Sequence, residues 1–224
     1  NPEARILAER ILFRNYDDPL PPHLIRARDA FQRRICRKEA LTDYAGNRHN
    51  IGFMALDRIA ADHGFGPWRK AHHGLMAEGR LGAEKVALLK PETFMNLSGK
   101  SVAALARFFK IAPEEILVAH DELDLPPGGI KLKLGGGTAG HNGLKDTQAR
   151  LSTPEFWRLR IGIGHPRDLY PGREVIDFVL ARPSREEQQA IDTRMELALD
   201  QVPALTQGHF ERAGQRLHTQ ARTP

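Results

Sequence analysis

Four short segments of this chain carry histidine, carboxylate and asparagine side chains in an order that indicates hydrolytic chemistry. They lie at residues 43–53, 93–100, 120–124 and 140–143. A neutral imidazole can take a proton from water, a carboxylate can orient that imidazole, and amide groups can hold a polar acyl group. This combination predicts a hydrolase that activates water.

His49 is the candidate general base, and Asp121 is its candidate partner. His49 lies where a helix is expected to begin, and because the chain contains ten histidines an ordinary helix-start histidine is the alternative. Asp121 follows an apolar run at residues 116–119, and α/β folds place functional loops after such buried strands. A carboxylate there can accept a hydrogen bond from the far nitrogen of the imidazole and fix its tautomer.

Two other uses of Asp121 stay open. It can cap backbone donors of its loop, or it can bind Mg²⁺ together with Glu122 and Asp124. The turn at residues 126–128 and the lack of a second acidic cluster weigh against magnesium. No His-Glu-x-x-His motif is present, and the remaining histidines form no recognisable ligand set. We expect no metal and no other cofactor.

Amides and cations occupy further positions of interest. Asn96 and Asn142 can donate to a developing oxyanion or bind a peptide carbonyl, but each precedes a predicted helix, so capping is the alternative. The exposed N–H groups expected in the glycine-rich stretch 135–143 suit binding of an anion or a substrate backbone. The stretch lacks the Gly-Lys-Ser/Thr ending of a nucleotide-binding loop, and the alternative is a flexible linker. Lys133 and Arg160 lie on predicted strands, where they either clamp a phosphate or form solvated faces.

The elements that must position these side chains alternate along the chain. Helical periodicity or capping patterns predict helices over residues 51–64, 98–110, 142–151 and 184–199, followed by a basic helix. Apolar runs and alternation of apolar and polar residues predict strands at 74–76, 85–89, 116–119, 130–134 and 156–163. This order predicts an α/β fold: a single three-layer domain with a mixed, mostly parallel central sheet flanked by helices.

Residues 1–43 differ from the rest. A breaker at residues 15–22, which contains three prolines, separates two possible helices, and the second has apolar residues at helical spacing with basic residues around them. We expect an atypical basic segment here, helical or poorly ordered, followed by the catalytic domain at 44–224. A helix with a solvated face and an RNA-binding arm are both open.

Composition narrows the class of protein. The 224 residues include 33 Lys and Arg against 28 Asp and Glu, with a pI near 9.6, which favours polyanionic partners without deciding for nucleic acid. No apolar run approaches the ~20 residues needed to cross a bilayer, and the N-terminus lacks the apolar segment of a signal peptide. The single cysteine, Cys36, forms no internal disulfide, so we expect a cytoplasmic protein without a membrane association.

The polar segments, taken together, resemble those of the bacterial peptidyl-tRNA hydrolase family. The resemblance rests on residues 46–50 (Gly-Asn-Arg-His-Asn), 93–99 (Thr-Phe-Met-Asn-Leu-Ser-Gly), 118–126, 140–145 and 158–166, which occur in the family's order. It implies a single mixed-sheet α/β domain, independent of metal and normally monomeric. The implied activity is cleavage of the ester between a peptide and tRNA, which frees tRNA for translation.

The resemblance also implies roles for individual residues. His49 matches the catalytic base, Asp121 its partner, and Asn96 and Asn142 the amides that bind the peptide end and help to position water. The remaining matches are Tyr44 and Phe94 for substrate binding, Lys133 and Arg160 for the tRNA 5′-phosphate, with Arg158 as a rival to Arg160, and His141 for the acceptor stem. The implied partner is peptidyl-tRNA, with no obligate protein partner.

One part of the family pattern is not found in this sequence. Family members begin with a buried strand and a Gly-Asn-Pro-Gly-like turn just before the position of Tyr44, where this chain has residues 37–43 and no such turn. We expect the first strand and the asparagine of that turn to be missing. The alternatives to an active hydrolase are a non-catalytic RNA-binding relative and an impaired product without its first strand.

Overall fold

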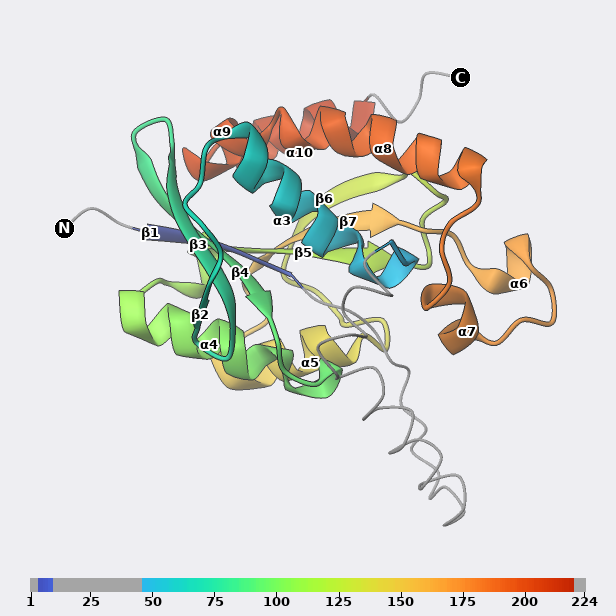
Figure 1. The fold of residues 1–224 in the computed structure, drawn as a ribbon, viewed down its shortest axis with the longest axis horizontal. Coiled ribbons are helices and arrows are strands. Elements are labelled where there is room, and N and C mark those ends of the chain that lie inside the picture. The colour runs from blue at the N-terminus through green and yellow to red at the C-terminus, as the bar shows by residue number, and fades with distance from the viewer. Residues whose placement is uncertain (1–3, 10–45, 220–224) are drawn as a thin grey trace, which may run out of the picture.

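A seven-stranded mixed sheet forms the middle layer of the molecule, in a computed structural model that describes residues 4–9 and 46–219 (Figure 1). In order across the sheet, the strands are β2 (Arg69–Ala71), β3 (Gly74–Leu81), β4 (Glu84–Pro91), β1 (Ala4–Glu9), β5 (Ile116–Glu122), β7 (Trp157–Gly162) and β6 (Ile130–Leu134).

Helices cover both faces of this sheet (Figure 1). One face carries α3 (Ile51–Asp62), α8 (Arg185–Leu199), α9 (Val202–Thr206) and α10 (Phe210–Thr219), and the other carries α4 (Ser98–Phe109) and α5 (Asn142–Leu151). The short helices are α6 (Pro166–Leu169) and α7 (Val175–Val179) near one end, and the 3-10 turns η1 (Arg48–Asn50), η2 (Met95–Leu97) and η3 (Pro113–Glu115). The predicted three-layer α/β fold is confirmed.

The four inner strands β4, β1, β5 and β7 run parallel, whereas β2, β3 and β6 join the sheet by antiparallel pairing. Three neighbouring pairs are thus parallel and three antiparallel, so the sheet is mixed, and only its centre is parallel. The reason is that tight turns join β2, β3 and β4 at one edge, whereas at the other edge β6 pairs antiparallel with β7 after a connection that contains α5.

The expectation that the first strand is missing is wrong. Ala4–Glu9 forms β1, which pairs with β4 on one side and β5 on the other, in the middle of the sheet. A short apolar run suffices for a central strand, and this one lies further from residue 44 than the family pattern led us to expect. The rest of the segment 1–43 and the domain boundary at residue 44 lie outside the described residues.

The core divides into two apolar layers, one on each face of the sheet. Successive residues of β5 alternate between them: Leu117 and Ala119 pack with α3 and α8, and Ile116 and Val118 pack with α4 and α5. Because consecutive strand side chains point to opposite faces, a strand covered on both sides reads as one continuous apolar run. The burial predicted for residues 116–119 is confirmed.

Helix ends follow the predicted capping chemistry. The hydroxyl of Ser184 accepts from the backbone of Glu187, whose carboxylate accepts in return from the Ser184 backbone N–H, so the predicted capping box opens α8. The other predicted helices match α3, α4 and α5 to within a few residues.

Candidate active site

His49 and Asp121 lie next to each other in the interior. Nδ1 of His49, in η1, is 3.6 Å from Oδ1 of Asp121, near the end of β5, and their side chains are 4% and 0% exposed. Neither carboxylate oxygen of Asp121 has a hydrogen-bond partner among the described residues. A small rotation of the imidazole to the usual N–H···O distance of roughly 2.9 Å would satisfy one of them. The geometry brings the predicted base and its partner together.

A network of contacts from residues 178–187 holds η1 in place. The guanidinium of Arg48 donates to the carbonyls of Phe178 and Ala181 and to the carboxylate of Glu187, and the amide of Asn47 donates to the carbonyl of Leu180. Asn47, Arg48 and His49 are all buried. This part of the site is therefore fixed to the end of α7 and the start of α8.

Two buried histidines connect the end of β5 to the start of α5. His120 precedes Asp121, His141 precedes Asn142, and the two rings meet edge to face with centroids 4.9 Å apart. Nδ1 of His120 lies 2.7 Å from the carbonyl oxygen of Asp121. Burial is the main cause that lowers the pKa of His120, although the nearby Asp121 backbone and carboxylate act in the opposite direction.

The predicted amides stand outside the capping positions. His141 is the N-cap of α5, and its Nδ1 accepts from the backbone N–H of Leu144 at 3.2 Å, whereas Asn142 is the first helical residue. Asn96 lies within η2, exposed, while Leu97 is the N-cap of α4. Capping therefore does not account for either asparagine side chain.

A glycine brings the two asparagine-bearing segments together. A Cβ on Gly99 would lie 2.4 Å from the carbonyl oxygen of Asp146, so α4 and α5 touch backbone to backbone at this point. The same packing sets η2, which carries Asn96, against α5, which begins at Asn142. Only glycine allows this approach, which places both amides at one end of the α4–α5 layer.

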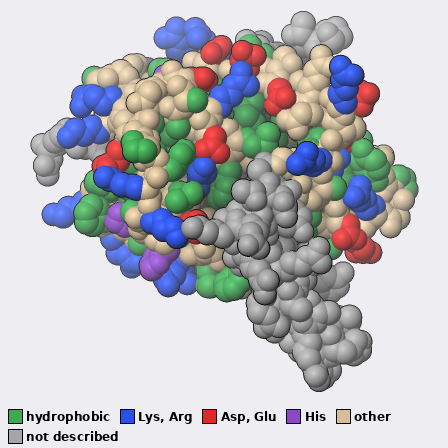
Figure 2. Space-filling view, viewed as in Figure 1, with side chains coloured by type: hydrophobic (Ala, Val, Ile, Leu, Met, Phe, Trp, Pro, Cys, Tyr) green, Lys and Arg blue, Asp and Glu red, His purple; other side chains and the backbone are tan. Residues whose placement is uncertain are grey.

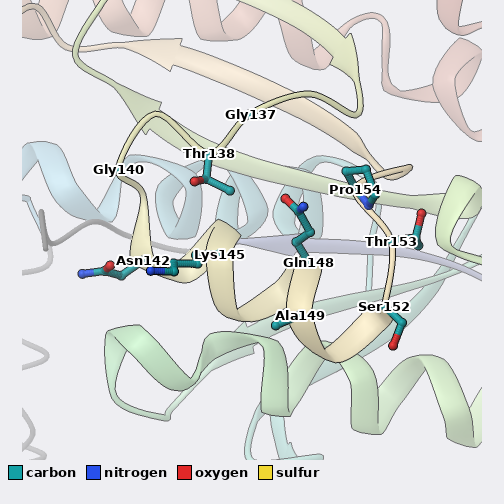
Figure 3. Close-up of a pocket in the computed structure, with 10 residues that line it drawn as sticks. All are labelled: Gly137, Thr138, Gly140, Asn142, Lys145, Gln148, Ala149, Ser152, Thr153 and Pro154. Atoms are coloured by element: carbon teal, nitrogen blue, oxygen red, sulfur yellow. The ribbon is translucent and has the colours of Figure 1, made fainter.

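A groove of about 570 Å³ runs between the glycine-rich loop and α5 (Figure 3). Asn142 and Lys145 lie at the amino end of the helix, and Gln148 points from its middle toward Gly137 and Thr138. His49 and Asp121 do not line this groove. The groove is thus a separate compartment that shares Asn142 with the predicted site.

Arg158 supports the glycine-rich loop from below. Its guanidinium is buried and donates to the carbonyls of Gly137 and Gly136 at 2.6 and 2.9 Å, over the ring of Phe156. Burial, followed by the charge of Arg160, lowers the pKa of Arg158. Because its donors serve the loop, Arg158 is a support of the groove rather than an exposed cation.

Arg160 and Lys133, the two predicted phosphate-binding cations, are both accessible to solvent. Nε of Arg160 lies 2.8 Å from the carboxylate of Glu122, with 24% of its side chain exposed. Lys133 is exposed on β6, opposite Arg158 in register, and forms no ion pair with the carboxylates of the described chain. The choice between Arg158 and Arg160 thus favours Arg160.

Of the remaining predicted residues, Phe94 is exposed and His141 is buried. Phe94 is 41% exposed, close in sequence to Asn96. His141, predicted to touch the acceptor stem, is only 2% exposed. Its ring is engaged in capping α5 and in packing on His120, so the structure places it behind the surface rather than on it. Tyr44 lies outside the described residues.

Cations are spread over the described part of one face of the molecule. Figure 2 shows Lys and Arg side chains across this face, interspersed with Asp and Glu. Within residues 4–9 and 46–219, no group of three or more His, Cys, Asp or Glu is arranged to hold a metal ion. In the same residues no helix combines the length and the apolar composition needed to cross a bilayer.

Sequence reasoning assigned no role to Arg48 or Lys145, although both lie inside the quoted motifs. Arg48 directly precedes the candidate base, and Lys145 lies one turn after Asn142. Their closeness in sequence to His49 and Asn142 was the signal that could have identified them. The partner of Arg48, Glu187, is far along the chain and has no sequence mark besides its place in a capping box.

Comparisons with known proteins show the family to which this chain is similar. A family model described as peptidyl-tRNA hydrolase matches residues 40–224. A curated peptidyl-tRNA hydrolase of Bordetella avium (strain 197N) is 55% identical over 178 residues, which cover 79% of this chain and 86% of that protein. The crystal structure of peptidyl-tRNA hydrolase from Acinetobacter baumannii is similar with a TM-score of 0.75 and 35% identity, over 96% of this chain and 94% of that one, and the same values hold for a crystal structure of peptidyl-tRNA hydrolase in complex with N-propanol. The chain belongs to the peptidyl-tRNA hydrolase family.

Proposed function

We propose that His49 and Asp121 carry out the ester hydrolysis by which a peptidyl-tRNA hydrolase releases tRNA from peptidyl-tRNA. The observation that carries this proposal is the burial of an imidazole beside a carboxylate that has no hydrogen-bond partner in the described part of the chain. A buried carboxylate without partners is costly for stability, and such groups concentrate at functional sites.

In the proposed mechanism, Asp121 accepts a hydrogen bond from Nδ1–H of His49 and fixes the tautomer. Nε2 then takes a proton from water as the water oxygen attacks the ester carbonyl carbon. The bond from that carbon to the ribose oxygen breaks, and the proton passes from Nε2 to the departing hydroxyl. The amides of Asn96 and Asn142 hold the peptide end, and donate to the oxygen that gains charge.

Substrate contacts are assigned from the family resemblance and, for the described residues, from their position. Lys133 and Arg160 supply positive charge for the tRNA 5′-phosphate, and Phe94, exposed near Asn96, together with Tyr44 contacts the peptidyl or aminoacyl group. His141 shapes the start of α5 from behind and so supports tRNA contact indirectly. The groove along α5 adds Lys145 and the N–H groups of the glycine-rich loop, which suit the phosphodiester backbone.

The proposed setting follows from the family and from the charge balance. Peptidyl-tRNA is the substrate, and the enzyme acts as a monomer in the cytoplasm without an obligate protein partner. Size-exclusion chromatography with light scattering at micromolar concentration tests the monomer directly.

The decisive experiment is release of tRNA from N-acetylaminoacyl-tRNA and from unblocked aminoacyl-tRNA by the protein and its His49→Ala variant. We expect rapid cleavage of the blocked substrate alone, reduced on the order of 10²–10⁴-fold in the variant, the usual contribution of a positioned base. His63→Ala is the matched control, because His63 is exposed at the opposite end of α3.

A folded protein that binds tRNA but leaves the ester intact would sink the hydrolase proposal for this chain. That result would favour the non-catalytic RNA-binding alternative. The other alternative, a product impaired by a missing first strand, loses its basis because β1 pairs with both β4 and β5.

A further inference from the structure

The guanidinium of Arg48 is clamped between the end of α7 and the start of α8. Nη1 donates to the carbonyl oxygens of Phe178 at 3.1 Å and Ala181 at 3.3 Å, and Nη2 lies 2.5 Å from Oε2 of Glu187. The guanidinium carbon also stands 4.1 Å from the centre of the Phe178 ring. The guanidinium is therefore held in three directions: toward the carbonyls at and just after the end of α7, toward the Glu187 carboxylate, and against the Phe178 ring.

The charges of this clamp are matched to the helices that form it. The C-terminal carbonyls of α7 favour a cation, and the N-terminal turn of α8 favours a carboxylate. Glu187 is itself held by the backbone N–H of Ser184 at 2.6 Å. The Arg48 side chain is 1% exposed, so it has no alternative partner in solvent, and loss of either charge leaves the other buried and unpaired.

The residue clamped in this way directly precedes the candidate base. Arg48 also donates its backbone N–H to Ala181 at 3.1 Å, and Asn47 donates its side-chain amide to Leu180. The turn η1 contains only Arg48, His49 and Asn50. A fixed start of so short a turn determines the direction in which the next side chain leaves the backbone.

We infer that Arg48, held by Glu187, is the positioning residue that aims the His49 imidazole at Asp121. This inference rests on the proposed function, since it takes His49 as the base. The inference goes beyond that function in one respect: α7 and α8 contribute no catalytic group, but they influence the rate of the chemical step because they hold the Arg48–Glu187 pair.

A second buried cation, Lys90 on β4, pairs with α3 and separates this role from simple anchoring of the helix. Nζ of Lys90 forms an ion pair with the carboxylate of Asp57 and lies 4.0 Å from the centre of the Trp68 ring. Asp57 lies in the middle of α3, the helix that follows η1. The Lys90–Asp57 pair therefore holds the middle of this helix and not the turn that carries His49. Loss of this pair loosens α3 without releasing η1.

The experiment compares Arg48→Lys with Lys90→Met. In each we would measure kcat and KM for N-acetylaminoacyl-tRNA, the melting temperature, and the ¹⁵N resonances of the His49 ring, which report its tautomer. For Arg48→Lys we expect kcat to fall about 10- to 100-fold, the cost of a misplacement on the order of 1 Å, with KM changed by less than about threefold. The ring signals should change from one dominant Nδ1–H tautomer to a mixture.

Lys90→Met should lower the melting temperature and leave kcat and the ring signals as in the unmodified protein. Glu187→Gln keeps an acceptor for Ser184 and removes only the charge, so it serves if Arg48→Lys does not fold; we expect the same changes in kcat and tautomer, reduced in size. An Arg48→Lys or Glu187→Gln protein that is less stable but retains kcat and a single tautomer would overturn the inference.

Failure of the proposed function gives a different result. In that case the unmodified protein does not cleave the ester, or His49→Ala cleaves it equally well. The tautomer of His49 is measured without substrate and so tests the clamp in either case.

Discussion

Nδ1 of His49 lies 3.6 Å from Oδ1 of Asp121, although one residue lies in the turn before α3 and the other lies near the end of β5. The strand β5 is fully buried, and its end is the point at which a carboxylate can be enclosed by α3 on one face of the sheet. The pair is thus a consequence of how α3 crosses β5.

The first prediction concerns Asp121→Asn. An amide cannot stabilise the imidazolium that forms when His49 takes a proton, so we expect kcat to fall about 10³–10⁴-fold with KM little changed. Because the substituted amide carries no charge in this buried site, the melting temperature should stay equal or rise. Steady-state cleavage of N-acetylaminoacyl-tRNA and thermal unfolding check the two parts, and unchanged kcat would contradict the role given to Asp121.

The second prediction separates two cations that face each other across β6 and β7. Arg158→Gln removes two hydrogen bonds to Gly136 and Gly137 from a buried site and should lower the free energy of unfolding by about 1–3 kcal/mol. Lys133→Gln should leave stability unchanged and weaken tRNA binding, with the slope of log K against log salt smaller by about 1. Filter binding at several salt concentrations and denaturant unfolding measure both; a salt slope unaffected by Lys133→Gln would exclude its phosphate contact.

The third prediction uses glycines in two different surroundings. Gly99→Ala places a Cβ 2.4 Å from the Asp146 carbonyl oxygen, so we expect a loss of roughly 1–3 kcal/mol in stability and a raised KM as α5 and Asn142 are displaced. Gly214→Ala in α10 meets only Leu132, at 3.9 Å, and should add about 0.5–1 kcal/mol through helix propensity. Equal effects of the two substitutions would show that the α4–α5 contact is adaptable.

The fourth prediction concerns pH and His120. Burial lowers the pKa of His120 below the ordinary value of 6.5, so its neutral form persists in the folded protein at a pH where the unfolded chain binds a proton. Stability is therefore unaffected by His120 above about pH 6.5 and falls as the pH drops below it, by at most about 1.4 kcal/mol per pH unit, until the folded pKa is reached.

We expect His120→Gln to make the stability profile between pH 7.5 and 5 shallower, and His63→Gln, at an exposed position, to leave it unchanged. Urea unfolding at each pH gives the profile. Parallel profiles for the unmodified protein and His120→Gln would mean that another group causes the acid sensitivity.

The helices and strands that carry local signals were predictable from the sequence. The capping box of Ser184 and Glu187, the alternation of residues 130–134 and the apolar run at 116–119 each encode their element within a few residues. β1 was missed because its apolar run, residues 6–8, is too short to mark a strand by itself, and its position in the sheet depends on pairing with β4 and β5, strands far along the chain.

The sequence by itself determined which side chains are available for chemistry and in which order they occur, because motif residues and secondary-structure periodicity are local properties. Only the tertiary structure decided which of them are exposed or supporting: Arg158 is buried beneath the loop while Arg160 reaches the surface, and His141 lies inside. It also decided that Glu187 meets Arg48. Burial and long-range pairing arise from the packing of segments distant in sequence, and no local pattern records them.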